Sequence, residues 1–394
     1  MTDWIRVKLS DCLARVEWPV NVVQDKHYTQ IGIRSHGKGV FHKESVTGEE
    51  LGNKAVYWVE PDCFVLNIVF AWEQAIGKTT ASEAGMIASH RFPMYRPKDN
   101  LVDIDYLISF FMTKRGKEVL EAASPGGAGR NRTLGQERFL NSVITLPPIT
   151  EQRKIAEILS AQDRIIELKT KLLEEKKRLK KYLCQLIMGG NKIKLARGYS
   201  VRLLSSITKK KLIKNKDLKY SVVLSNSAKY GIVPQNVQFD KNIANEENID
   251  RYYVAEIGDF IYNPRISTSA PCGPINQNDY CDGVVSPLYT VFSCSAECVC
   301  DKYLKYYFQT SLWHEYIQSV ANTGARYDRM NVSDKDFFSM AINLPPLNTQ
   351  RQCVVLLDAF SNVIKLMEEN LEQEKLKKKA LMQQLLTGKV RVTV

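Results

Sequence analysis

The sequence predicts an α+β protein in which two mixed α/β globular domains alternate with two long antiparallel coiled-coil helices, as a pseudo-two-fold internal repeat. One observation is a segment beginning LPP that occurs twice, at Leu146 and Leu344, and the copies align without a gap to Gly190 and Gly388. The other is that each copy follows a block rich in short strand patterns. The predicted domains are a first globular block over residues 1–145, a helix over 146–190, a second block over 191–343, and a helix with the C-terminus over 344–394.

The prolines that open each copy end whatever precedes them, because the residue before a proline disfavours the α region. Thr150 and Asn348 then stand where a helix cap is expected. The first helix is predicted from Glu151 to Met188, on the order of 55 Å at 1.5 Å per residue. Each helix should end at its glycine, Gly190 or Gly388, in the left-handed conformation.

Leucine and isoleucine recur every seven residues along both copies, which predicts a coiled coil. Two adjacent rows are available in the first copy: Ile158, Ile165, Leu172, Leu179 and Leu186, and beside them Leu159, Ile166, Leu173 and Ile187; the second copy matches with Leu357, Ile364, Leu371 and Leu385. A two-fold relation between the halves would make the helices antiparallel. The lysines that crowd both C-terminal parts are either a solvated face that complements the helix dipole or a face for phosphates or a partner.

The two globular blocks also correspond to each other. VEPDCFVLN at Val59 echoes VAEIGDFIYN at Val254, a polar turn and then an apolar run that ends at Asn67 or Asn263. Each block then carries a segment expected to be one amphipathic helix. We expect any closure of the chain to rest on the N-terminal segment packing near the second helix.

The net charge of +12 favours a polyanionic partner. The N-terminal segment lacks an apolar core of signal-peptide length, so we expect a cytoplasmic protein. Nine cysteines in such a chain do not indicate a disulfide framework. Cys294, Cys298 and Cys300 lack paired zinc spacing, so we interpret them as small buried side chains on a strand.

Motifs for catalysis are incomplete. AIGKTT at Ala75 resembles the end of a phosphate loop, but Trp72 stands where the first glycine is required. YNPR at Tyr262 lacks the second proline and the aromatic of the amino-methyltransferase motif, and no glycine-rich cofactor loop precedes it. The five histidines have no metal or triad spacing. The sequence therefore indicates a binding surface, with no catalytic residue, metal or cofactor of its own.

Basic, polar and aromatic side chains recur at matching places in both blocks. Arginine, asparagine and lysine read base edges, whereas lysine, serine and threonine hold phosphates. Any one segment can be an ordinary exposed loop, but their recurrence favours a DNA-facing surface. The candidates of the first block are Arg34, His36, Lys38, Lys43, Trp72, Lys78, Thr79, Thr80, Arg130 and Arg132. Those of the second are Lys209, Lys210, Asn226, Lys229, Tyr230, Asn263, Arg265, Ser267, Thr268, Arg326, Tyr327 and Arg329.

LPPITEQR and LPPLNTQR, each leading into a coiled coil, together with IGDFIYNPR and TGARYDRMNVSDKDFF, resemble the specificity subunit of a type I restriction–modification enzyme over essentially the whole chain. The resemblance implies two target recognition domains, each reading one half of a bipartite asymmetric DNA site, and helices that set the spacer. It also implies docking of two methyltransferase (modification) subunits, and of one or two restriction subunits where these are present. S-adenosylmethionine, and ATP with magnesium, would be bound by those partners.

The resemblance places the docking region on the helices. The corresponding residues here are Gln152, Arg153, Leu159, Ile166, Leu173, Leu183, Gln350, Arg351, Leu357, Ile364, Leu371 and Leu381. Three alternatives stay open: a stand-alone two-domain DNA-binding protein, a nucleotide-dependent enzyme, and a coiled-coil scaffold. The first would need a visible reader such as a helix-turn-helix, the second an intact phosphate loop, and the third another explanation of the charge.

Overall fold

The structure is a computed structural model that describes residues 3–52, 54–126, 132–189, 198–235, 246–322 and 328–392. It divides into two compact units. Unit 1 comprises Met1–Thr170 and Glu369–Val394, and unit 2 comprises Lys171–Glu368. Each unit therefore combines one globular block with a segment of each long helix, α6 (Ile149–Met188) and α12 (Leu347–Leu385).

Unit 1 begins with β1 (Ile5–Lys8), α1 (Leu9–Cys12), β2 (Leu13–Val16), β3 (His27–Ile33), β4 (Val40–Thr47), α2 (Gly48–Leu51), β5 (Val56–Trp58) and β6 (Phe64–Leu66). It continues with η1 (Ala71–Glu73), β7 (Ile76–Lys78), η2 (Ala81–Glu83), β8 (Ile87–Ser89), β9 (Met94–Pro97), α3 (Ile104–Phe111), α4 (Lys114–Ala122), α5 (Gln136–Leu140) and β10 (Val143–Leu146).

Unit 2 contains β11 (Ser200–Leu203), α7 (Leu204–Ile207), β12 (Thr208–Lys211), β13 (Leu224–Ser227), β14 (Gly231–Pro234), η3 (Glu246–Arg251), β15 (Tyr253–Ala255) and β16 (Phe260–Tyr262). These are followed by β17 (Ile275–Gln277), β18 (Gly283–Val285), β19 (Thr290–Cys294), α9 (Asp301–Phe308), α10 (His314–Val320), α11 (Asp334–Phe338) and β20 (Ala341–Leu344).

The strand order of unit 1 is repeated in unit 2. The sheet β2-β9-β6-β7 corresponds to β12-β19-β16-β17, and the pair β1-β10 corresponds to β11-β20. In unit 1, β4-β3-β8-β5 form one sheet, in which β3 and β8 are joined by a single parallel bridge. In unit 2, the pairs β13-β14 and β15-β18 are joined by a parallel bridge at Val223 and Val284. The predicted α+β repeat is therefore confirmed, although the remaining strands form one sheet in unit 1 and two pairs in unit 2.

The core of each unit contains aromatic side chains that pack on or within the repeated sheet. Phe64 stacks on Phe139 in unit 1, with ring centroids 6.1 Å apart. Phe260 stacks on Phe292 in unit 2, at 5.4 Å. Residues of α6 and α12 join both cores, so burial of apolar surface fixes each helix segment on its own globule.

Both long helices begin directly after the proline pair, and the first begins two residues earlier than the predicted Glu151. Ile149 is the first residue of α6 and Leu347 the first of α12, so Thr150 and Asn348 lie inside the first turn and do not cap it. The helix can begin there because the backbone carbonyl of Pro148 accepts the first helical hydrogen bond, from Gln152 N at 3.0 Å. Gly388 has a φ of 70°, as predicted, whereas Gly190 lies outside the described residues.

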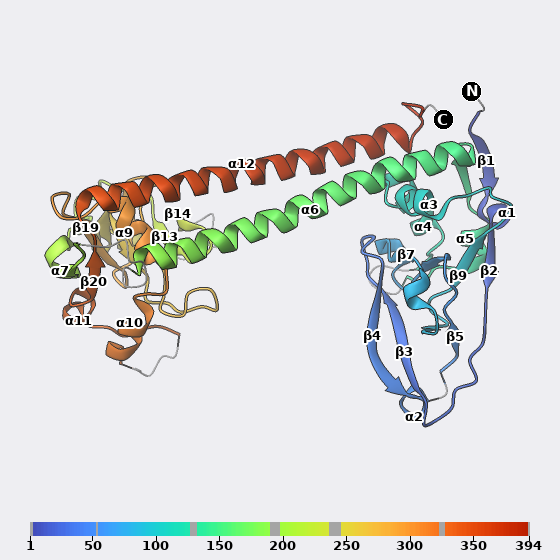
Figure 1. The fold of residues 1–394 in the computed structure, drawn as a ribbon, viewed down its shortest axis with the longest axis horizontal. Coiled ribbons are helices and arrows are strands. Elements are labelled where there is room, and N and C mark those ends of the chain that lie inside the picture. Colours follow the sequence, from blue (N-terminus) through green and yellow to red (C-terminus); the bar gives the residue numbers. More distant parts are fainter. Residues whose placement is uncertain are drawn as a thin grey trace. The chain divides into compact units, whose positions relative to one another are not determined.

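The two helices run antiparallel within each unit. In unit 1, Gln162 donates to Glu374 at 2.8 Å and Lys169 donates to Asn370 at 2.6 Å. A later residue of α6 thus contacts an earlier residue of α12, as in an antiparallel pair. In unit 2, the ion pair of Lys177 with Glu368, at 3.0 Å, joins the same two helices. Figure 1 shows α6 in green beside α12 in red.

Of the two candidate rows of the coiled coil, the row of Leu159 and Leu173 is buried, together with Leu357, Ile364 and Leu371 of the second helix. The other row is largely exposed. Its exposed fractions are 39% for Ile165, 51% for Leu172 and 39% for Leu179. A heptad places both rows on adjacent faces, so spacing alone could not choose between them.

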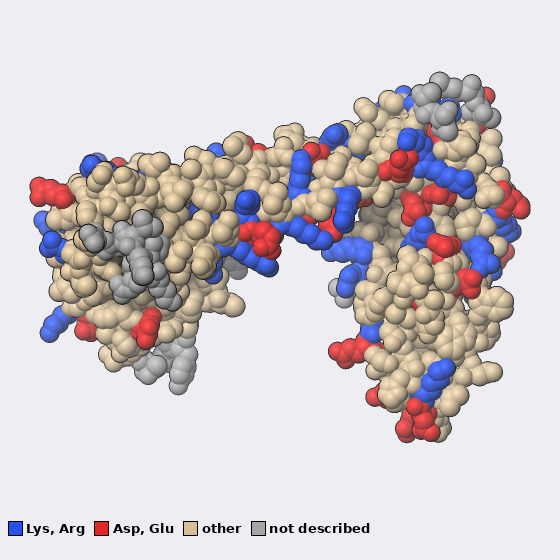
Figure 2. Space-filling view, in the orientation of Figure 1, with Lys and Arg blue, Asp and Glu red and all other residues tan. Residues whose placement is uncertain are grey.

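The helical lysines divide between internal pairs and open positions. Lys177 pairs with Glu368, Lys378 with Asp163 at 2.5 Å, and Lys375 with Glu372 at 2.6 Å. Basic and acidic side chains are interspersed on the face of the molecule drawn in Figure 2. These three lysines are thus paired with carboxylates of the two helices.

The N-terminal segment and the C-terminal tail meet in unit 1, as expected. The guanidinium of Arg391 lies over the Trp4 ring, 5.9 Å from its centroid. It also holds the buried Glu151 carboxylate through Nε at 2.8 Å and Nη2 at 2.7 Å. A side chain at Gly388 would come within 3.2 Å of the Trp4 ring. The tail is thereby fastened to the first turn of α6.

Two further expectations are corrected. Each block has two successive helices, α3 with α4 and α9 with α10, where one was expected; in unit 1 the break is at Thr113, whose hydroxyl caps α4 by accepting from Gly116 N at 3.1 Å. Of the clustered cysteines, Cys294 lies on β19, whereas Cys298 is exposed. All nine cysteines are free.

Candidate nucleic-acid interface

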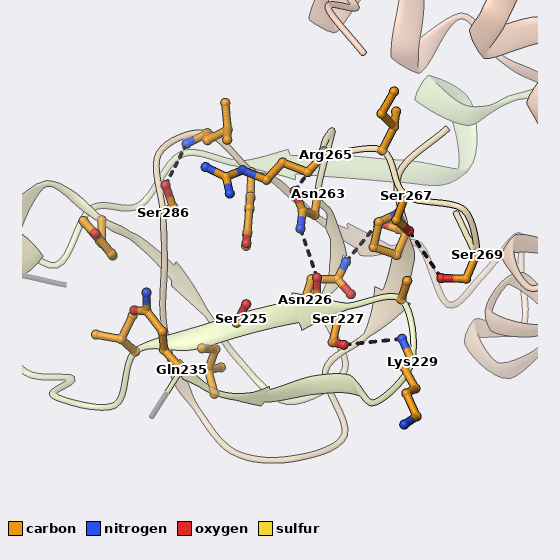
Figure 3. Close-up of a pocket in the computed structure, with 18 residues that line it drawn as sticks. Ser225, Asn226, Ser227, Lys229, Gln235, Asn263, Arg265, Ser267, Ser269 and Ser286 are labelled. Atoms are coloured by element: carbon orange, nitrogen blue, oxygen red, sulfur yellow. Dashed lines mark hydrogen bonds between the residues drawn. The ribbon is translucent and has the colours of Figure 1, made fainter. Parts of the chain in front are cut away.

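A pocket of about 430 Å³ opens in unit 2 between the β13–β14 hairpin and the loop that follows β16. Five of the residues predicted to face DNA line it: Asn226, Lys229, Asn263, Arg265 and Ser267. Figure 3 shows Ser225, Ser227, Gln235, Ser269 and Ser286 around the same cavity. No Asp or Glu is found among the described residues that line it, so the pocket suits a ligand with negative charge or acceptor atoms.

The floor of the pocket is held by amide side chains whose hydrogen bonds point inward. Asn226 Nδ2 donates to Ile261 O at 2.6 Å and to Pro274 O at 3.0 Å, and its Oδ1 accepts from Asn276 at 2.7 Å. Asn263 Nδ2 donates to Asn226 O at 3.0 Å. Both asparagines are buried, and their amides are used to shape the pocket, a role different from the base contact predicted for them.

Sequence reasoning missed the serines of β13 and the residues opposite them. β13 reads LSNS and all four residues are buried, although three are polar. Such a strand does not show the alternation of a half-buried strand, and a buried polar run is a signal of internal hydrogen bonding. Gln235 and Ser286 had no recognisable signal, because their place in the pocket depends on tertiary packing.

The remaining candidates of unit 2 that the structure describes lie on segments beside this pocket or on β12. The loop after β16 pairs with the 328–330 segment: Arg265 and Arg329 form an antiparallel bridge. Lys229 lies over the Tyr230 ring at 4.7 Å from its centroid. Thr268 is exposed, as is Lys209, and Lys210 pairs with Asp334. Arg326 and Tyr327 lie outside the described residues, as does Arg130 in unit 1.

In unit 1, the tip of the β3–β4 hairpin rests on the turn around η1. His36 N donates to Glu73 O at 2.8 Å, and His36 has a φ of 61°. Arg34 lies over the Phe41 ring at 4.6 Å, and Arg132 over the Trp72 ring at 5.6 Å. The turn contacts bring four predicted residues to neighbouring segments of unit 1: Arg34, His36, Trp72 and Arg132. Lys38 is exposed at the tip, and Lys43 lies farther along β4 over Phe92.

The predicted residues from Lys78 to Thr80 have internal partners. Burial opposes the charge of Lys78, but the hydrogen bond from its Nζ to Asp105, at 2.9 Å, and the nearby Asp62 carboxylate outweigh it and raise the pKa of Lys78. Thr79 is buried, and its hydroxyl donates to Glu60 O at 2.6 Å. AIGKTT therefore forms the strand β7 and the cap of the following turn, and not a phosphate-binding loop.

Thr80 caps η2 together with Glu83, which is also held by His42 at 2.7 Å. Burial raises the pKa of the Glu83 carboxyl, but hydrogen bonds from Ser82, His42 and Thr80 outweigh burial and lower it to about 2. This cluster fixes the start of η2 against β4.

The helix residues implicated in docking fall into two groups. Gln152, Leu159, Leu173, Gln350, Leu357, Ile364 and Leu371 are buried inside their own units, and Ile166, Leu183 and Leu381 are half-buried. Arg153 and Arg351 are exposed at the start of each helix. Among the apolar side chains that face outward, two positions recur in both copies: Ile165 and Leu168 on α6, and Val363 and Leu366 on α12.

Across the described part of the chain, no group of three or more His, Cys, Asp or Glu side chains could hold a metal ion. Over the same residues, no helix combines the length and apolar character needed to cross a membrane.

The repeated topology defines a protein of two related units, and the pocket of unit 2 has no Asp or Glu among the described residues that line it. The sequence matches the family described as the type I restriction modification DNA specificity domain over residues 54–178 and 203–376. Because the two matches cover well over half of the chain, it belongs to this family, that of the type I restriction–modification specificity subunits.

Two proteins of Methanocaldococcus jannaschii are similar along most of the chain. The "Putative type I restriction enzyme MjaX specificity subunit" is 24% identical over 347 residues, which cover 81% of this chain and 76% of that protein. The "Type I restriction enzyme MjaVIII specificity subunit" is 23% identical over 424 aligned residues, covering 99% of this chain and 93% of that protein.

Solved structures share the fold. The HsdS subunit from Thermoanaerobacter tengcongensis superposes with a TM-score of 0.58 at 16% identity, covering 98% of this chain and 97% of that chain. A chain from a structure titled for complex assembly and conformational transition of the type I R-M system gives a TM-score of 0.65 at 15% identity, with 97% of each chain covered. The predicted fold and family are confirmed.

Proposed function

We propose that this chain selects the DNA sequence on which a type I restriction–modification complex acts, and that each unit binds one half of a bipartite, asymmetric site. The carrying observation is the internal repeat: one topology occurs twice, with different side chains at equivalent surface positions. The net charge of +12 and the acid-free pocket of unit 2 suit a polyanion. We place the complex in the cytoplasm, where it meets DNA.

The helices are proposed to set the spacer between the half-sites and to dock two methyltransferase subunits. Ile165 and Val363 are exposed to 39% and 48%, and Leu168 and Leu366 to 49% and 63%, at equivalent positions of the two copies. A surface that occurs twice binds the same partner twice, so two copies of one subunit are expected. Exposed apolar side chains in such a row mark a protein-binding face.

The chemistry is assigned to those partners. They would bring S-adenosylmethionine and methylate an adenine in each half-site after flipping it out of the duplex. One or two restriction subunits, with ATP and magnesium, would join where the system includes them. The side chains of this chain would contribute recognition and docking, and no catalytic step is assigned to them.

The spacer role is tested by lengthening both helices together. Seven residues inserted after Leu168 and seven after Asn370 preserve the heptad register on both sides of the Lys169–Asn370 hydrogen bond. Seven residues add about 10 Å, or about three base pairs. We expect the methylated motif to keep both half-sites and to gain about three base pairs of spacer. An unchanged spacer would refute the role.

The alternative, a stand-alone two-domain DNA-binding protein, predicts a different result. The chain would then bind a site without the methyltransferase, and adenine methylation would not depend on it. Co-purification of the chain with its methyltransferase, lost when Leu168 and Leu366 are both replaced by Glu, would support docking. Undiminished co-purification would place the docking face elsewhere.

A further inference from the structure

One turn occurs in both units with the same hydrogen bonds and a different side chain. In unit 2, Asn263 Oδ1 accepts from Arg265 N at 3.0 Å, and in unit 1, Asn67 Oδ1 accepts from Val69 N at 3.1 Å. The residue after each asparagine accepts from the chain in the same way: Ile68 O from Leu134 N and Pro264 O from Met330 N, both at 2.8 Å. Arg265 and Val69 therefore occupy equivalent positions on the same backbone turn in the two units.

The backbone at Arg265 is held by hydrogen bonds on both sides. Its N–H is bound by Asn263, whose own amide is bound to the backbone of Asn226, and Asn226 is anchored to β16 at Ile261 O. The adjoining backbone is fixed on the other side, since Ile266 N donates to Asp328 O at 3.0 Å. Because this backbone is already fixed, binding a ligand has to order the Arg265 side chain alone, which lowers the entropic cost of a selective contact.

The guanidinium of Arg265 is available. Arg265 is exposed, and within the residues that the structure describes its guanidinium has no hydrogen bond or ion pair. Figure 3 shows its side chain extending along the pocket toward the side that carries Ser286. By contrast, the equally basic Arg329 on the paired segment is engaged by Asp328, at 3.4 Å from its Nε. The two neighbouring arginines thus differ in what they can offer a ligand.

We propose that Arg265 reads a guanine in the half-site bound by unit 2; this inference rests on the proposed function. A guanidinium donates two parallel hydrogen bonds to O6 and N7 of guanine, a pattern that no other base pair edge offers in the major groove. A carboxylate that took up those donors would compete with the base. None lines the pocket among the described residues, and the carboxylate of Asp328, on which the charge of Arg265 also acts, is paired with Arg329. The fixed backbone limits the fork to positions within reach of this one side chain, which favours contact with a single base edge.

The equivalent position in unit 1 carries Val69, which has no donor to offer. The effect of Arg265 is therefore confined to one half-site. This difference at one shared turn also gives a physical reason for an asymmetric site: the same scaffold would present a guanine-selective side chain once and an apolar one once.

The test uses the full chain in complex with its methyltransferase. Adenine methylation rates are measured on duplexes in which each base pair of the half-sites is replaced in turn. We expect Arg265→Ala to reduce discrimination at one guanine of one half-site by about 10- to 100-fold and to leave the other half-site unchanged. Arg202→Ala, which removes an exposed arginine on β11 of the same unit, is the matched control and should leave the preference intact.

Three results would overturn the inference. In the first, Arg265→Ala leaves the melting temperature unchanged and alters the preference at no guanine position of either half-site. Another is binding weakened uniformly for every sequence, with the salt slope reduced by about one, which identifies a phosphate contact. The third is equal relaxation by Arg202→Ala. Each of these leaves the proposed function standing, whereas methylation that does not depend on this chain would remove the proposed function itself.

Discussion

Gln152 and Gln350 occupy the same place in the two copies and differ by one hydrogen bond. Gln152 Oε1 accepts from Asp103 N at 2.9 Å, and its Nε2 donates to Leu101 O at 2.9 Å and Pro147 O at 2.8 Å. Gln350 Oε1 accepts from Cys300 N at 2.8 Å, and its Nε2 donates to Pro345 O at 2.9 Å. Both side chains are buried, so each ties the start of a long helix to its own globule.

Replacing either glutamine with alanine should therefore destabilise its own unit, by unequal amounts. A net contribution of about 1 kcal/mol for each buried hydrogen bond gives about 3 kcal/mol for Gln152→Ala and about 2 kcal/mol for Gln350→Ala. At 1.4 kcal/mol for each factor of ten, the amide protection at the affected N–H should fall by about 100-fold and about 30-fold. The exposed Gln383 is the control, and Gln383→Ala should cost less than about 0.5 kcal/mol.

Native-state hydrogen exchange followed by mass spectrometry measures this separately in the two units, through peptides that contain Asp103 or Cys300. Local exchange avoids treating a chain of two units as a single two-state transition. Equal losses for the two variants, or a larger loss for Gln350→Ala, would refute the assignment of these hydrogen bonds as the clamp.

Three further predictions concern single contacts. Glu83→Gln should lower the melting temperature at pH 7, because the ionised carboxylate stabilises unit 1 above its ordinary pKa of 4.5 and this stabilisation is lost as the pH falls toward about 2. In a series of melts at falling pH, the difference in melting temperature between the variant and the natural chain should vanish over that range. A difference that does not depend on pH would contradict this prediction. Tyr306→Phe removes the hydrogen bond to Asp358 at 2.6 Å and should cost about 1 kcal/mol in denaturant unfolding, whereas no change would show that the bond is dispensable. Arg391→Met leaves the buried Glu151 carboxylate without its guanidinium and should lower the melting temperature; adding Glu151→Gln should recover part of the loss, and additive losses would rule out the pairing.

Much of the fold was predictable because the chain repeats its own pattern. The two LPP copies predicted both long helices, and Gly388 predicted the end of the second. The corresponding runs that end at Asn67 and Asn263 predicted equivalent strands, which the structure shows as β6 and β16. A repeat reports positions that matter twice, and this is stronger information than local propensity.

The site was predictable in part. Residue type selected Arg265, Asn226 and Asn263, and the structure brings these three to one pocket. Their different roles depend on partners far away in sequence, such as Ile261 O for Asn226, which no local pattern reveals. The choice between the two rows of the coiled coil depended in the same way on tertiary packing, since Leu159 and Ile165 lie on adjacent faces of one helix.

The central claim is that this chain chooses the DNA sequence that its partner methylates. The most direct measurement is modification-sensitive long-read sequencing of DNA from cells that carry this chain and its methyltransferase, with and without the gene for this chain. The account predicts a split, adenine-methylated motif that disappears on deletion and returns on complementation. Methylation unchanged by the deletion, with the methyltransferase shown to be expressed, would contradict it.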